Sequence, residues 1–141
     1  MSTWSYELIP HRGAMRLLDE LIVWDDVRIH MRTASHACAD NPLRSDGQLR
    51  AVHLCEYGAQ AMAVHGGLLA QREGAVAAPG LLVSLRAVQL YVARVDDLPG
   101  PLGVYAEKLL DSGTSWQYAF RIEHRGQLLA EGRAAVIAAM G

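Results

Sequence analysis

One stretch near the middle of the chain is almost continuously apolar, and its hydrophobic positions leave hardly any face for solvent. This pattern predicts a long helix at about residues 48–71 that is buried on all sides. His53, Glu56 and Gln60 interrupt it at spacings of three and four residues, so they form one polar stripe along the helix. An unpaired carboxylate in apolar surroundings either raises its pKa or finds a partner. Glu56 is therefore the first candidate for chemistry, with a structural carboxylate bound by backbone N–H groups as the alternative.

Alternating hydrophobic and polar residues predict strands on both sides of this helix. Two strands precede the helix and four follow it, so an antiparallel sheet must wrap around the apolar helix. We therefore expect an α+β protein with the hot-dog fold, whose open sheet edges pair across a dimer. The predicted strands are residues 17–24, 27–33, 81–92, 102–110, 115–124 and 127–138.

Length and composition predict a single domain over residues 1–141. Hydrophobic residues make up 51% of the chain and charged residues 20%, which excludes a disordered protein. The net charge of −2, without a basic stripe, argues against nucleic acid, and no apolar run is long enough for membrane insertion. The N-terminus lacks the features of a signal peptide, and the two cysteines make neither a disulfide framework nor a zinc spacing. We therefore expect a cytoplasmic protein without a metal site.

Two motifs connect this pattern to a known family. LIPHRGAMRLLD occupies residues 8–19 and EYGAQA occupies residues 56–61. Together they resemble segments of the FabZ-type 3-hydroxyacyl-[acyl-carrier-protein] dehydratases. NPLR, at residues 41–44, brings the chain closest to the branch from aryl-polyene pigment clusters, the ApeP-like dehydratases. The resemblance implies removal of water from 3-hydroxyacyl thioesters on an acyl carrier protein, in aryl-polyene or related polyketide- or fatty-acid-like biosynthesis. It implies no cofactor other than the phosphopantetheine of the carrier.

The chain departs from that family at the catalytic histidine. In FabZ-type dehydratases this histidine lies in the loop before the helix, where the aligned position here is Asn41-Pro42. Only Glu56 therefore transfers directly, as the acid. His11 is our candidate for the base, with a capping or surface histidine as the alternative. His53, one turn from Glu56, is its rival, and His36 lies in the loop that approaches the helix.

Dehydration of a 3-hydroxyacyl thioester also needs groups that bind the substrate. A backbone N–H at the helix start can hold the thioester carbonyl, and Gly47 lies where the helix is expected to begin. Asn41 is a candidate for holding water or the substrate hydroxyl, although Asn before Pro also forms turns, and we favour the turn. Gln60 is a candidate partner of Glu56 or of the hydroxyl, with a structural amide as the alternative.

The expected partners are the acyl carrier protein and a second hot-dog subunit, in a homodimer or in a heterodimer with a more classical dehydratase. Arginines near the motifs are candidates for binding the acidic carrier or its phosphate, although a solvated surface is the simpler interpretation of any one of them. A non-catalytic hot-dog subunit that binds acyl chains or partners a catalytic dehydratase, and a hot-dog thioesterase, stay open as alternatives. The candidate docking residues are Arg12, Arg16, Arg44 and Arg50.

Overall fold

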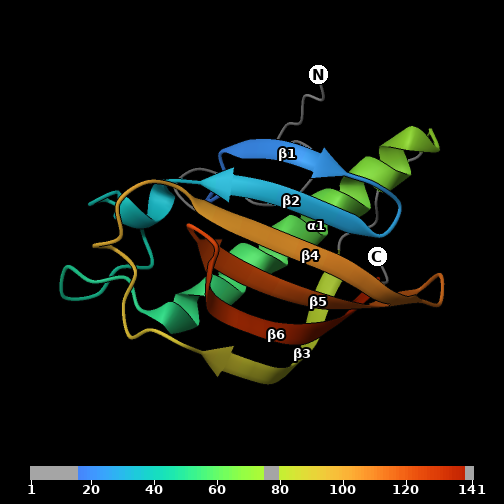
Figure 1. The fold of residues 1–141 in the computed structure, drawn as a ribbon. Coiled ribbons are helices and arrows are strands. Elements are labelled where there is room, and N and C mark those ends of the chain that lie inside the picture. Colours follow the sequence, from blue (N-terminus) through green and yellow to red (C-terminus); the bar gives the residue numbers. More distant parts are fainter. Residues whose placement is uncertain (1–15, 75–79, 139–141) are drawn as a thin grey trace.

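The computed structural model describes residues 16–74 and 80–138, which form one antiparallel sheet curled around one long helix (Figure 1). The six strands lie in the order β1-β2-β4-β5-β6-β3, so that β1 and β3 are the open edges of the sheet. This is the predicted hot-dog architecture, with all six strands and the helix in the predicted order. The strands are β1 (Glu20–Trp24), β2 (Arg28–Thr33), β3 (Gly80–Leu90), β4 (Leu102–Asp111), β5 (Ser115–His124) and β6 (Gln127–Ala138).

The helix begins later than the apolar pattern predicts. Helix α1 spans Leu54–Arg72 and follows the short 3₁₀ helix η4 (Ala51–His53), whereas the sequence predicts a start at residue 48. Asp46 and Gly47 both have positive φ, 54° and 71°, in a two-residue turn closed by backbone hydrogen bonds between its flanking residues. Such a turn requires positive φ at both central positions, which Asp-Gly adopts readily. Gly47 therefore lies in a turn ahead of the helix and not at its first turn, and this correction removes its N–H from the helix start.

The sheet covers most of α1 but not all of it. The predicted burial on all sides is wrong for this chain, because the sheet curls around one side of the helix only (Figure 1). Glu56, Ala59, Ala63 and Gly66 are partly exposed and follow one another at three- and four-residue spacings, which is a single line along the helix. The helix thus presents a narrow open stripe that starts at Glu56.

Two glycines let α1 and β6 approach Phe120 of β5 closely. A Cβ atom on Gly58 would lie 2.6 Å from the Phe120 ring, and one on Gly132 would lie 2.9 Å from it. Phe120 is 3% exposed and belongs to the hydrophobic core. The glycine inside the EYGAQA motif therefore sets the distance between the helix and the sheet.

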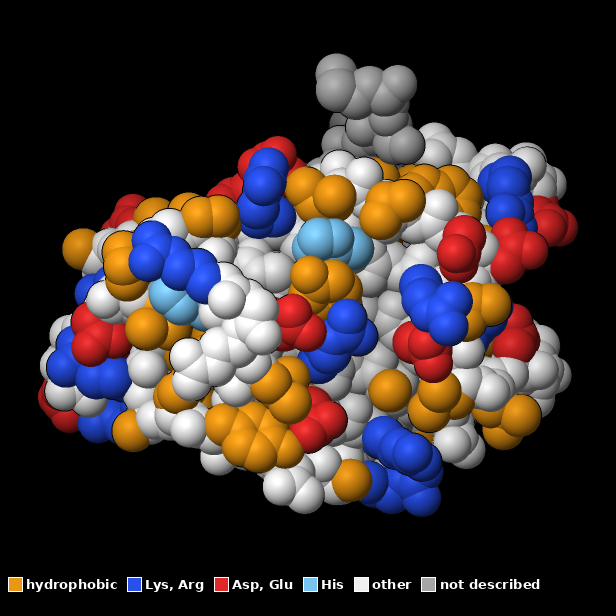
Figure 2. Space-filling model, viewed as in Figure 1, with side chains coloured by type: hydrophobic (Ala, Val, Ile, Leu, Met, Phe, Trp, Pro, Cys, Tyr) orange, Lys and Arg blue, Asp and Glu red, His pale blue; other side chains and the backbone are white. Residues whose placement is uncertain are grey.

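The outer face of the sheet is polar and carries both signs of charge. Side chains of neighbouring strands pair there, Arg28 with Glu107 at 2.8 Å and Arg32 with Glu20 at 2.9 Å. Figure 2 shows acidic and basic side chains intermingled over this face. Such a mixture is typical of a solvated surface and not of a surface that binds a polyanion. Among the described residues, no helix has the length and apolar character needed to cross a membrane.

Candidate active site

Glu56 lies in the first turn of α1, on the open stripe, and is partly exposed. A carboxylate is favourable there, because the first turn of a helix presents unpaired N–H groups and the positive end of the helix dipole. Its Oε1 accepts a hydrogen bond from Nε2 of Gln60, one turn later, at 3.5 Å. The structure thus gives Glu56 a polar neighbour and access to solvent, in place of the enclosed apolar environment that the sequence predicts.

Gln60 is completely buried, and the segment before β1 orients its amide. Its Oε1 accepts the N–H of Leu17 at 3.0 Å. A backbone N–H only donates, so the amide oxygen must face Leu17 and the NH₂ group must face Glu56. Of the two contacts expected for Gln60, the structure contains the one with Glu56, and the contact with a substrate hydroxyl stays a prediction.

The carbonyl of Leu17 is held in turn by the end of β2 and the chain that follows it. Thr33 Oγ1 donates to it, and Ser35 Oγ donates to it at 2.7 Å. Ser35 Oγ also lies 2.9 Å from the hydroxyl of Tyr57 on α1. Because Ser35 uses its only hydroxyl proton toward Leu17, the Tyr57 hydroxyl is the donor in this second bond. Both backbone groups of Leu17, its N–H and its carbonyl, are therefore hydrogen-bonded, and both connections lead to α1.

Asn41, at the position of the family's histidine, has its side chain engaged inside the protein. It is 7% exposed, and its Nδ2 donates to Ser35 O at 2.9 Å and to Tyr57 Oη at 3.0 Å. Its Oδ1 accepts the N–H of Leu43 at 2.9 Å, which is the turn that Asn before Pro favours. These contacts support the turn interpretation of Asn41.

Tyr57 is a member of this network that the sequence analysis does not identify. Its side chain is completely buried, and burial raises the pKa of its hydroxyl. A tyrosine within an apolar helix signals that a hydrogen-bond partner exists, because a buried hydroxyl must be paired. The identity of the partner depends on how the loop before the helix folds back, which no local pattern encodes.

The structure places two of the three candidate histidines, and both bind backbone groups. His53 is partly exposed, and its Nδ1 accepts the N–H of Arg50 at 3.3 Å, which stabilises the turn into α1. His36 is completely buried, and its Nε2 lies 2.9 Å from the carbonyl oxygen of Leu98. His11 lies outside the described residues, so its role as the base stays a prediction.

The predicted docking arginines differ in their surroundings. Arg16 and Arg50 are exposed. Arg44 is partly buried, and its two terminal nitrogens donate to backbone carbonyls of its own loop region at 3.3 and 3.4 Å, so it stabilises that loop. Arg12 lies outside the described residues. Two of the four arginines are thus exposed at the surface of the described residues.

A surface hollow of about 250 Å³ lies beside the network, between residues 16–19 and 34–42. Ser35, Cys38 and Asn41 are among the residues that line it, and Glu56 is not. Glu56 therefore belongs to the open stripe of α1 and not to this hollow.

Within the described residues, no group of three histidine, cysteine, aspartate or glutamate side chains is arranged to hold a metal ion.

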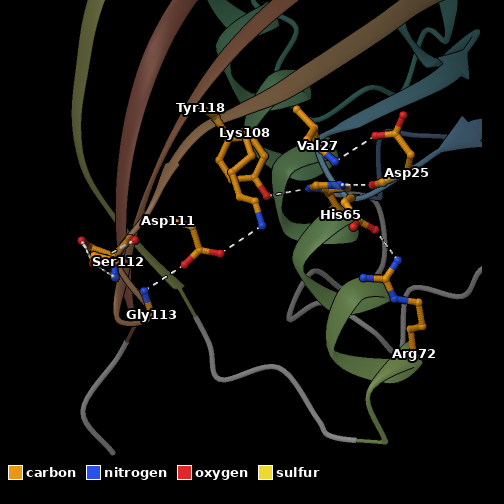
Figure 3. Close-up of polar contacts among 11 residues, drawn as sticks. Asp25, Val27, His65, Arg72, Lys108, Asp111, Ser112, Gly113 and Tyr118 are labelled. Carbon is orange, nitrogen blue, oxygen red and sulfur yellow. Dashed lines mark hydrogen bonds and ion pairs between the residues drawn. The ribbon is translucent and has the colours of Figure 1, made fainter.

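His65 belongs to a separate polar cluster, near the C-terminal end of α1 (Figure 3). Its Nδ1 lies 2.7 Å from the hydroxyl of Tyr118, and its Nε2 lies 2.8 Å from the carbonyl oxygen of Asp25. A carbonyl only accepts, so Nε2 carries the proton and Nδ1 accepts from the tyrosine. Burial lowers the pKa of His65 and raises that of Tyr118. The cluster joins α1 to the β1–β2 turn and to β5.

The chain matches one family model and a group of solved structures. The family model, described as ApeP-like, ApeP dehydratase, covers residues 5–140. The dehydratase heterocomplex ApeI:P from Xenorhabdus doucetiae is 24% identical, with a TM-score of 0.83 over 94% of this chain and 89% of that chain. No curated protein matches the sequence.

Two further structures share the fold at lower identity. A hypothetical thioesterase with coenzyme A from Streptococcus pneumoniae TIGR4 is 14% identical, with a TM-score of 0.62 over 85% of this chain and 84% of that chain. A thioesterase from Staphylococcus aureus subsp. aureus Mu50 is 13% identical, with a TM-score of 0.64 over 86% and 93%. At these identities the structural likeness concerns the fold alone.

Proposed function

The chain belongs to the ApeP-like dehydratase family, and we propose that it removes water from 3-hydroxyacyl thioesters bound to an acyl carrier protein. The observation that carries this proposal is Glu56, a carboxylate on the open stripe of α1 with one oxygen bound by the buried Gln60. The proposed reaction is a step of aryl-polyene or related polyketide- or fatty-acid-like biosynthesis. The reaction needs no cofactor beyond the phosphopantetheine arm of the carrier.

In the proposed reaction Glu56 is the acid and His11 is the base. His11 takes the α-proton, the electrons of that C–H bond form the new double bond, and the hydroxyl leaves as water with the proton of Glu56. His11 precedes Leu17 by six residues, and Leu17 is bound to Gln60. Six residues span at most about 20 Å, a length that permits His11 to reach Glu56. A backbone N–H at the start of α1 is the proposed donor to the thioester carbonyl.

We infer that the working enzyme is a dimer, either of two copies or with a more classical hot-dog dehydratase. Strand β3 supports this inference, because it is an open edge of 11 residues whose backbone groups can pair with another strand. Leu85, Val88 and Leu90 on this strand are 41%, 38% and 42% exposed. The likeness to the dehydratase heterocomplex ApeI:P supports the heterodimer version.

The carrier protein is proposed to dock near Arg16 and Arg50, which are exposed on the described surface. Arg50 directly precedes η4, and Glu56 follows η4 after two residues. An acidic carrier bound there would deliver its phosphopantetheine arm to the open stripe of α1. Arg12 stays a candidate, and Arg44 is less suitable because it binds its own loop.

Mass spectrometry of a 3-hydroxyacyl carrier protein tests the proposed function. The chain is added alone and with a more classical hot-dog dehydratase whose own acid has been removed. We expect the acyl carrier to lose one water, and H11A to lower the rate at least about 100-fold. Release of the free acid would identify a thioesterase instead. No turnover in either setting, with both chains folded, would identify a non-catalytic subunit.

A further inference from the structure

Two histidines bind consecutive carbonyl groups of the segment that connects β3 to β4. Nε2 of His36 lies 2.9 Å from Leu98 O, and Nε2 of His124 lies 2.6 Å from Pro99 O. Both imidazoles are buried, at 0% and 9% exposure. A carbonyl oxygen only accepts, so each Nε2 must carry a proton. One histidine comes from the chain after β2 and the other from the end of β5, so the segment is held from two directions.

The segment that the two histidines bind is itself hydrogen-bonded to the chain that leads into α1. The N–H of Val95 donates to Leu49 O at 2.9 Å, and the N–H of Ala51 donates to Ala93 O at 3.1 Å. The carboxylate of Asp96 accepts the N–H of Leu49 at 2.9 Å. The position of the helix start, and with it the first turn of α1, therefore depends on this segment.

The environment of His36 accommodates only the neutral imidazole. Its Nδ1 is buried and, within the described residues, has no hydrogen-bond partner, so a proton there would lack an acceptor. Two basic groups face it, Arg44, which donates to the His36 carbonyl at 3.3 Å, and His124. The acidic group facing it, Asp19, already accepts the N–H of Ala34 at 2.7 Å. Burial lowers the pKa of His36, the hydrogen bond to Leu98 O opposes this in part, and the two basic groups reinforce the lowering.

The carboxylate that anchors the same segment keeps its charge near neutral pH. Arg94 forms an ion pair with Asp96, and this contact, with the N–H of Leu49, holds the pKa of the Asp96 carboxyl far below its usual range. Asp97, which lies 3.9 Å from Arg94, is exposed. A change of pH between about 5 and 7 therefore acts on this segment through His36 and not through Asp96.

We propose that His36 is a pH-sensitive latch on the start of the Glu56 helix. The neutral imidazole holds the Leu98 carbonyl, and protonation withdraws it from this buried position, which loosens residues 93–98 and residues 49–51 together. The latch goes beyond the proposed dehydration and does not depend on it, because it involves only contacts within this chain and no substrate.

Hydrogen exchange measured by mass spectrometry on the full chain tests the latch. After correction for intrinsic rates, we expect protection of residues 49–51 and 93–98 to fall at least about tenfold from about pH 7 to about pH 5.5. In H36Q, whose amide can donate to Leu98 but cannot titrate, protection should be equal at the two pH values. The variant H65Q changes a buried histidine of the other cluster and should retain the wild-type fall at both segments.

Nitrogen-15 NMR of the wild-type histidines provides a second test that needs no variant. We expect His36 as the Nε2–H tautomer at neutral pH, and we expect its protonation to coincide with the loss of protection. Three results would each overturn the latch: unchanged protection in the wild type, an equal fall in H36Q, or a protonated His36 with both segments still protected.

Discussion

At the scale of single residues, the candidate site depends on a buried amide whose two ends have different partners. Gln60 accepts from Leu17 and donates to Glu56, so its orientation follows from the backbone. The spacing of Glu56 and Gln60 identifies both residues in the sequence, because three- and four-residue steps share one helix face. Leu17 as the anchor could not be predicted, since it lies 43 residues away along the chain.

Replacing Gln60 by leucine tests its role in positioning Glu56. Q60L keeps much of the volume but leaves the Leu17 N–H without an acceptor, and we expect a loss of about 1–3 kcal/mol in unfolding free energy. The rate of dehydration, measured as kcat, should fall at least about tenfold, and KM should be nearly unchanged. The control is Q71L, the same change at an exposed position of α1, which should leave both quantities as in the wild type. Unchanged kcat in Q60L would contradict the positioning role.

At the scale of elements, helix α1 contains two glycines with different surroundings. Gly58 permits contact with Phe120, whereas a Cβ on Gly66 would meet no atom within 4 Å. The apolar run predicts the helix itself, and the alternating segments predict the strands. The run misplaces the helix start, because the local signal of Asp46-Gly47 for a turn competes with the hydrophobic pattern. The open stripe was not predicted, because it depends on how far the sheet curls.

The two glycines give a matched pair of alanine variants. G58A should lower the unfolding free energy by about 1–3 kcal/mol, because the new methyl group overlaps the Phe120 ring. G66A should be neutral or stabilising by up to about 1 kcal/mol, since alanine is the better helix former and the space is open. Urea unfolding of both variants measures the difference. Equal stabilities would show that the helix and sheet do not approach as described.

At the scale of the whole molecule, buried histidines join the helix, the sheet and the loops. His36 and His65 are both completely buried, and each donates from Nε2 to a backbone carbonyl. Their neutral forms are part of the fold, and for both residues burial lowers the pKa. No sequence pattern indicates this, because their carbonyl partners come from segments distant in the sequence.

Stability should therefore fall as the pH falls below about 6.5. In that range the unfolded chain binds protons at His36 and His65 while the folded chain does not, so the unfolded state is favoured. The expected slope is at most about 1.4 kcal/mol per pH unit for each histidine, until the lower folded pKa is reached. Urea titrations at about pH 7.5 and about pH 5.5 measure it. Equal or greater stability at the lower pH would contradict the neutral, buried state of these histidines.

We expect a lysine on one open edge of the sheet to weaken subunit association and a lysine on the other edge to leave it unchanged. A lysine at Leu85 on β3, which is 41% exposed, should weaken association with a second hot-dog subunit at least about tenfold. The control is V23K on β1, at a position that is 60% exposed, and it should leave association unchanged. Sedimentation velocity of each variant, alone and with a classical dehydratase, measures this. Weaker association in V23K but not in L85K would place the interface at the opposite edge.

The most direct test of the central claim, that Glu56 carries the chemistry, is the rate of water loss from a 3-hydroxyacyl carrier protein with E56Q. The variant retains the size of the side chain and removes its ionisable proton, and it is compared with the wild type in the same assembly after both are shown to be folded. The account predicts a rate at least about 100-fold lower in E56Q. A rate equal to that of the wild type would contradict it.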